Sequence, residues 1–95
     1  MNICMIGGGY VGLVSAACFS EFGWRVTCVD KDEARVAELV RGEMPIYEPG
    51  LEDLVARNVG AGRLSFTSEL GPAVRNADVV LLAVGTPMRR GDGYA

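Results

Sequence analysis

A glycine-rich turn near the start of the chain constrains the fold more than any other feature. Residues 2–7 form a short, mostly apolar run that ends in glycine, as a buried strand does. Gly7, Gly9 and Gly12 have the G-x-G-x-x-G spacing of a dinucleotide-binding turn. There the first glycine makes the turn, the second lets the backbone approach a pyrophosphate, and the third lets the helix pack close to the strand. Glycine clusters also occur in ordinary turns, so the surrounding sequence has to decide.

The rest of the sequence predicts an alternation of strands and helices. Pro72 is tolerated only near the first turn of a helix, so we expect the fourth helix to begin at residue 72. The last strand is apolar throughout, which predicts burial on both faces. The predicted helices cover 11–22, 32–41, 50–58 and part of 68–76, and the further strands cover 25–30, 64–67 and 78–84.

This order of elements predicts an α/β fold, the first half of a Rossmann-type doubly wound parallel sheet with strand order 3-2-1-4. The strand–helix–strand crossovers should be right-handed. The sequence of 95 residues stops inside a turn. We therefore expect residues 1–95 to be a partial dinucleotide-binding Rossmann domain, the N-terminal portion of a longer protein. Its last strand would then be an exposed, association-prone edge.

Asp30 supplies the chemistry that the glycine turn alone lacks. It ends the second predicted strand, close to the spacing of about 20 residues at which an acid follows the glycines of a dinucleotide site. A carboxylate there can accept hydrogen bonds from the adenosine ribose hydroxyls. It would also repel a 2′-phosphate, which favours NAD over NADP as the cofactor. The alternative is that Asp30 only caps the following helix.

Two more residues lie near the expected cofactor. Arg35 follows one helical turn after the acid, and Thr86 follows the fourth strand at the carboxyl edge, where ligands bind in open α/β sheets. From position alone, a solvated arginine and a simple strand-ending turn explain them equally well. Arg89 and Arg90 are more simply explained as solvated loop residues, and Glu48 as part of a helix start.

Composition argues against several other classes of function. The net charge is −3 with no basic stripe, so nucleic-acid binding has little support. No apolar run approaches membrane-spanning length and no signal-peptide pattern is present, so we expect a cytoplasmic location. The sequence has no histidine, which excludes a histidine-based metal site or nucleophile pair within it. Cys4, Cys18 and Cys28 stand at apolar positions without a metal spacing, which predicts buried, reduced thiols.

Several segments together resemble the UDP-glucose/GDP-mannose dehydrogenase family. They are Met5–Val14, Val29–Asp30, Pro45–Leu51 and Ala83–Pro87, and the resemblance covers essentially the whole sequence. Segments 61–67 and 89–93 make bacterial members that oxidise UDP-glucose the most similar. Gly8 stands in a slot that usually varies in the family, a departure that we expect to be harmless.

The resemblance implies an NAD-dependent oxidoreductase that oxidises the 6-hydroxyl of UDP-glucose twice, with two NAD, to give UDP-glucuronate. It implies NAD contacts from Tyr10, Val11, Asp30, Arg35 and Thr86. The catalytic cysteine of the family and most contacts to the nucleotide sugar fall beyond residue 95. No catalytic residue is therefore assigned, and the chain alone should be inactive. We expect the parent to form a homo-oligomer.

Two other functions stay open. A related dehydrogenase that acts on another nucleotide sugar, such as GDP-mannose, would share this segment because the substrate contacts lie mostly outside it. A non-catalytic module that senses NAD would share it too. A downstream domain with a catalytic cysteine would favour the enzyme, and a transporter or regulatory region would favour the sensor.

Overall fold

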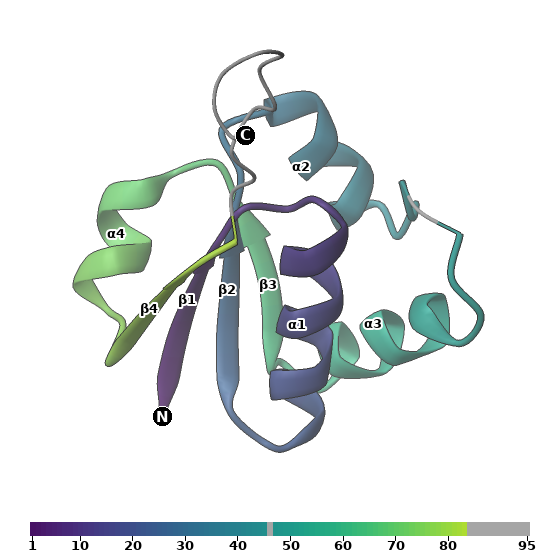
Figure 1. Ribbon diagram of the computed structural model, residues 1–95, viewed down its shortest axis with the longest axis horizontal. Helices are drawn as coiled ribbons and strands as arrows, with labels where there is room; N and C mark the ends of the chain where they lie inside the picture. The colour runs from purple at the N-terminus through teal and green to yellow at the C-terminus, as the bar shows by residue number, and fades with distance from the viewer. Residues whose placement is uncertain (46, 84–95) are drawn as a thin grey trace, which may run out of the picture.

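The computed structural model describes residues 1–45 and 47–83. Its four strands form one parallel sheet in the order β3-β2-β1-β4 (Figure 1), which confirms the predicted strand order and the α/β class. Along the chain the elements are β1 (Asn2–Ile6), α1 (Tyr10–Glu21), β2 (Arg25–Val29), α2 (Glu33–Val40), α3 (Leu51–Gly60), β3 (Leu64–Thr67), α4 (Leu70–Arg75) and β4 (Val79–Leu82).

Helices lie on both sides of the sheet. The connections from β1 to β2 and from β2 to β3 step in one direction across the sheet, whereas the connection from β3 to β4 steps back. Right-handed crossovers therefore place their helices on opposite faces. Figure 1 shows α1 and α3 on one side and α4 on the other. α1 packs on β2 and on α3, and α2 packs on β3.

The core lies between α1 and the sheet. Leu13, Ala16 and Ala17 of α1 are fully buried, and they share one apolar cluster with Met5 of β1 and Val26 of β2. The two alanines let the helix axis approach the strands closely because they add little bulk. This packing fixes the start of α1 relative to the carboxyl end of β1.

A buried polar network holds the opposite edge of the sheet, where the strands begin. Asn58 is completely buried, and its side-chain amide donates to Glu21 Oε1 and to the Leu54 carbonyl, both at 2.9 Å. Its Oδ1 accepts from Arg63 Nε at 2.9 Å, and Arg63 Nε also donates to the Ser20 carbonyl at 3.0 Å. The network ties the end of α1 to α3 and to the start of β3.

Two expectations for the end of the chain were wrong. β4 is not buried on both faces: Val79, Val80 and Leu82 are 37%, 41% and 72% exposed. It forms an edge of the described sheet, and α4 buries none of its own residues over it. α4 begins at Leu70, before the expected start at residue 72. Pro72 still lies in the first turn, where its missing N–H has no intrahelical partner to lose.

Candidate dinucleotide-binding site

The three motif glycines meet different physical demands. Gly7 has a φ of 116°, a backbone conformation that other residues rarely adopt, and its N–H donates to the Val29 carbonyl at 2.7 Å. A Cβ on Gly12 would lie 1.8 Å from the Gly7 carbonyl oxygen, so only glycine lets α1 pack against the turn. A Cβ on Gly9 would meet nothing within 4 Å. The first and third glycines are thus required by the protein itself, whereas the second faces open space.

The open space at Gly9 coincides with the start of α1. Gly9 is the N-cap of this helix and makes no side-chain hydrogen bond to the N–H groups of the first turn. That turn contains no acidic residue either. The first N–H groups of a helix lack intrahelical partners and carry the positive end of the helix dipole. This end of α1 is therefore suited to a phosphate group.

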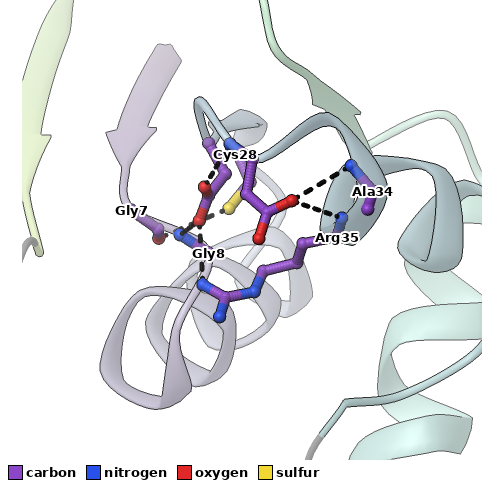
Figure 2. A network of polar contacts seen from close by, with 7 residues as sticks. Gly7, Gly8, Cys28, Ala34 and Arg35 are labelled. Carbon is purple, nitrogen blue, oxygen red and sulfur yellow. Dashed lines mark hydrogen bonds and ion pairs between the residues drawn. The ribbon is translucent and has the colours of Figure 1, made fainter.

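Asp30 lies at the end of β2 and accepts from three donors, of which Gly8 and Arg35 are labelled in Figure 2. Its Oδ2 accepts from the Gly8 N–H at 2.8 Å and from Arg35 Nη1 at 3.1 Å, and its Oδ1 accepts from the Asp32 N–H at 2.9 Å. The side chain of Asp30 is 12% exposed, and that of Arg35 is 39% exposed. The carboxylate therefore has a fixed orientation beside the glycine turn.

The surroundings of Asp30 favour its charged form. Burial raises the pKa of the carboxyl, but the N–H groups of Asp32 and Gly8 and the Arg35 guanidinium outweigh burial, so its pKa is lowered overall. The alternative that Asp30 only caps the next helix is wrong. The N-cap of α2 is Asp32, whose Oδ1 accepts from the N–H groups of Ala34 and Arg35 at 3.1 and 3.2 Å. Asp30 is therefore not the N-cap of α2.

A cavity of about 460 Å³ joins the glycine turn to Asp30. Gly7, Gly9, Asp30 and Arg35 all contribute to its wall, and Leu70 of α4 lines it from the other side of the sheet. The structure therefore brings four of the predicted cofactor residues into one concave space. A second cavity, of about 400 Å³, lies beside the loop before α3 and is lined by the carboxylates Glu48, Glu52 and Asp53.

The remaining predicted residues lie elsewhere. Gly12 does not line the cavity; it lies against the Gly7 carbonyl, where it lets α1 pack on the turn. Tyr10 and Val11, in the first turn of α1, are 50% and 62% exposed and do not line the cavity of Asp30. Thr86 lies outside the described residues, as do Arg89 and Arg90.

Gly8 belongs to the site although its slot in the glycine motif is a variable one. Besides the hydrogen bond from its N–H to Asp30, a Cβ on Gly8 would lie 2.9 Å from Asp30 Oδ2 and 3.5 Å from Arg35 Cδ. Gly8 thus gives the carboxylate and the guanidinium room to lie over the turn. No motif spacing signals this role, because it depends on where the end of β2 meets the turn.

The cysteines differ in their surroundings. Cys4 and Cys28 are buried as predicted, but Cys18 is exposed, because it falls on the outer side of α1. Burial, and after it the negative charge of Asp30, raise the pKa of Cys28 to about 12, so its thiol stays protonated. The Cys28 thiol donates to the Gly7 carbonyl at 3.7 Å (Figure 2). It therefore supports the turn and does not act as a nucleophile.

In the part of the chain that the structure describes, none of the helices is long and apolar enough to cross a membrane. Within residues 1–45 and 47–83, no three histidine, cysteine or acidic side chains gather as metal ligands.

The sheet order, the glycine turn and the acid at the end of β2 define the class of protein: a Rossmann-type dinucleotide-binding domain. Residues 1–95 match the family described as UDP-glucose/GDP-mannose dehydrogenase family, NAD binding domain. The chain belongs to this family, and NAD is the dinucleotide of its domain.

Individual relatives agree with this assignment. The chain is 61% identical over 95 residues to a UDP-glucose 6-dehydrogenase of Rhizobium meliloti, covering 100% of this chain and 22% of that protein. It is 58% identical over 87 residues to a UDP-glucose 6-dehydrogenase of Pseudomonas aeruginosa, covering 92% of this chain and 19% of that protein. The chain thus spans about a fifth of the length of these curated relatives.

Solved structures share the fold. A ternary complex of GDP-mannose dehydrogenase from Pseudomonas aeruginosa superposes with a TM-score of 0.90 at 41% identity, over 95% of this chain and 21% of that one. A UDP-glucose dehydrogenase from the archaeon Pyrobaculum islandicum gives a TM-score of 0.88 at 40% identity, over 94% of this chain and 21% of that one.

Proposed function

We propose that residues 1–95 are the N-terminal part of the NAD-binding domain of a UDP-glucose 6-dehydrogenase. The intact protein then oxidises UDP-glucose to UDP-glucuronate with two NAD. The identity of 61% to the Rhizobium meliloti enzyme supports this choice of substrate. A cytoplasmic location and assembly into a homo-oligomer belong to the same proposal.

The observation that carries NAD binding is the ionised, immobilised carboxylate of Asp30 on the wall of the cavity beside the glycine turn. In the proposed complex, Asp30 accepts hydrogen bonds from the adenosine ribose, and the pyrophosphate lies over Gly9 at the start of α1. NAD, when bound, supplies the acceptor for the hydride of the substrate. The residues that we propose contact NAD or shape its site are Gly7, Gly9, Tyr10, Val11, Gly12, Asp30, Arg35 and Thr86.

Arg35 has two roles in this proposal. Its guanidinium pairs with Asp30 and so keeps that carboxylate ionised, and its remaining N–H groups can donate to a ribose hydroxyl or lie beside the adenine. Only one guanidinium nitrogen, Nη1, is engaged by Asp30. Because the pair is neutral overall, the ribose end of the site offers no net positive charge to a 2′-phosphate, which favours NAD over NADP.

The chain binds and orients the cofactor, and we assign no catalytic residue within it. The groups that hold the nucleotide sugar and the cysteine that carries the intermediate aldehyde are proposed to lie beyond residue 95. For the 95 residues alone we therefore expect no turnover of the sugar.

The test is a titration and a turnover assay on the intact protein. We expect NAD to bind more tightly than NADP in calorimetry. In the turnover assay, UDP-glucose should yield two equivalents of reduced NAD, measured by absorbance, with one equivalent of UDP-glucuronate. GDP-mannose is the matched substrate control. Oxidation of GDP-mannose in preference to UDP-glucose would replace the proposed substrate, and NAD binding without oxidation of either sugar would favour a sensor.

A further inference from the structure

A side-chain hydrogen bond joins the start of α1 to the loop between α2 and α3. The Tyr10 hydroxyl donates to Glu48 Oε1 at 3.1 Å, across 38 residues of sequence. Tyr10 is the first residue of α1 and directly follows Gly9, which lines the cavity of Asp30. Glu48 thus contacts Tyr10, which is adjacent in the chain to Gly9 on the wall of the cavity.

Glu48 is exposed, but its backbone is anchored to the start of α3. The Glu48 carbonyl accepts from the Leu51 N–H at 3.0 Å, and Leu51 is only 4% exposed, within the core. Gly50 between them is the N-cap of α3 with a φ of 85°, and its carbonyl accepts from the Leu54 N–H at 3.1 Å. The loop therefore ends at a helix whose first residue, Leu51, packs in the core.

Tyr10, by contrast, has little else to hold its ring. Half of the residue is exposed, and its hydroxyl makes no other hydrogen bond among the described residues. A half-exposed ring samples more than one rotamer unless a contact selects one. The Glu48 carboxylate supplies that contact. Its hydrogen bond, and then its charge, raise the pKa of the Tyr10 phenol, as a bond to the protonated form must.

We propose that Glu48 is a positioning residue of the dinucleotide site: its carboxylate fixes the Tyr10 ring beside the glycine turn and so orders the wall along which NAD binds. This inference rests on the proposed function, because it assumes that Tyr10 contacts NAD. Glu48 itself does not touch the cofactor. Its carboxylate acts only through the phenol, so any acceptor of similar shape at position 48 should serve.

The test is NAD affinity of the intact protein, measured by calorimetry for four variants. Glu48→Ala and Tyr10→Phe each remove the hydrogen bond and should each raise the Kd for NAD about three- to tenfold. Combining them should add little to either, because both remove the same contact. Glu48→Gln keeps an acceptor and should bind within about twofold of the natural protein.

Matched controls separate this role from general effects. Glu52→Ala removes a nearby carboxylate in the first turn of α3, and Tyr47→Phe removes the hydroxyl of a tyrosine that is 91% exposed. Neither should change the Kd. A purely structural role for Glu48 would lower the melting temperature of Glu48→Ala and leave its Kd unchanged, which would overturn the inference. Additive effects of the two single changes would also overturn it.

Asp30→Ala separates a failure of the proposed NAD binding from a failure of the role of Glu48. If the natural protein binds no NAD, the proposed function fails, and this inference fails with it. If the natural protein binds NAD, and Asp30→Ala weakens binding while Glu48→Ala and Tyr10→Phe do not, only the inference about Glu48 fails.

Discussion

Replacement of Asp30 by alanine should weaken NAD binding strongly while leaving the fold intact. The change removes the carboxylate at the end of β2 and frees the three donors that it accepts from, which are the Gly8 N–H, the Asp32 N–H and the Arg35 guanidinium. Gly8 and Arg35 line a partly open cavity and Asp32 is exposed, so water can hydrate all three. The loss should therefore fall mainly on affinity for the cofactor.

The size of the loss follows from how much of the carboxylate is available. A carboxylate has about four accepting positions, and Gly8, Arg35 and Asp32 occupy three of them. Roughly one position is left for a ribose hydroxyl. One hydrogen bond to a charged group contributes about 1.5–3 kcal/mol. The Kd for NAD should thus rise roughly 10- to 150-fold.

The assay is calorimetric titration of the intact protein with NAD, beside thermal unfolding of the same samples. Glu33→Gln is the matched control, because it removes an exposed carboxylate from the first turn of α2 that does not line the cavity. We expect that control to bind NAD like the natural protein. An Asp30→Ala variant that unfolds at the usual temperature and binds NAD with unchanged affinity would refute the role of Asp30 at the ribose.

Three further predictions concern the same site. Asp30→Asn should raise affinity for NADP relative to NAD, because the positive charge of Arg35 is then no longer neutralised by Asp30. Adding Arg35→Gln should remove this gain in NADP affinity. Titrations of the single and double variants with NADP measure both effects. Gly12→Ala should lower the free energy of unfolding by about 1–3 kcal/mol through the clash with the Gly7 carbonyl. Gly9→Ala should chiefly weaken NAD binding. Urea unfolding that shows Gly9→Ala to be the less stable of the two variants would contradict this. The pKa of Asp30 is lowered in the folded state, so ionised Asp30 stabilises the fold at pH values above its unfolded-state pKa of about 3.9. This stabilisation is lost as the pH falls through the folded-state pKa. Acid unfolding of Asp30→Asn should therefore lack this pH-dependent loss of stability.

The architecture could be predicted from the sequence because its signals are local. The glycine spacing, the acid at the end of the second strand and the alternation of elements each depend on a few neighbouring residues. Together they determine the strand order through the handedness of crossovers. The start of α4 was missed because the proline rule limits Pro72 to the first turn without saying which position of that turn it takes.

The remaining errors and omissions depend on contacts between distant segments. The apolar composition of β4 does not reveal whether other elements cover both of its faces, and α4 buries none of its own residues over it. Cys18 was misplaced because α1 is apolar on most of its circumference, so its sequence does not mark an outer face. The bonds of Gly8 to Asp30 and of Tyr10 to Glu48 join positions 22 and 38 residues apart. The proposed contact from Thr86 stays a prediction.

The buried network around Asn58 has a consequence for how this domain tolerates change. At the amino edge of the sheet, the buried Asn58 side chain is satisfied by Glu21, Arg63 and the Leu54 carbonyl. Replacing Arg63 would leave the buried Asn58 Oδ1 unpaired and reduce stability. At the carboxyl edge, the N-cap of α1 is Gly9, which has no side chain to accept from the first N–H groups of the helix. Substitution of Gly9, where an added Cβ meets nothing within 4 Å, can therefore change what the domain binds at little cost in stability. Gly7 and Gly12 at the same edge, and the network at the amino edge, are constrained by the fold itself.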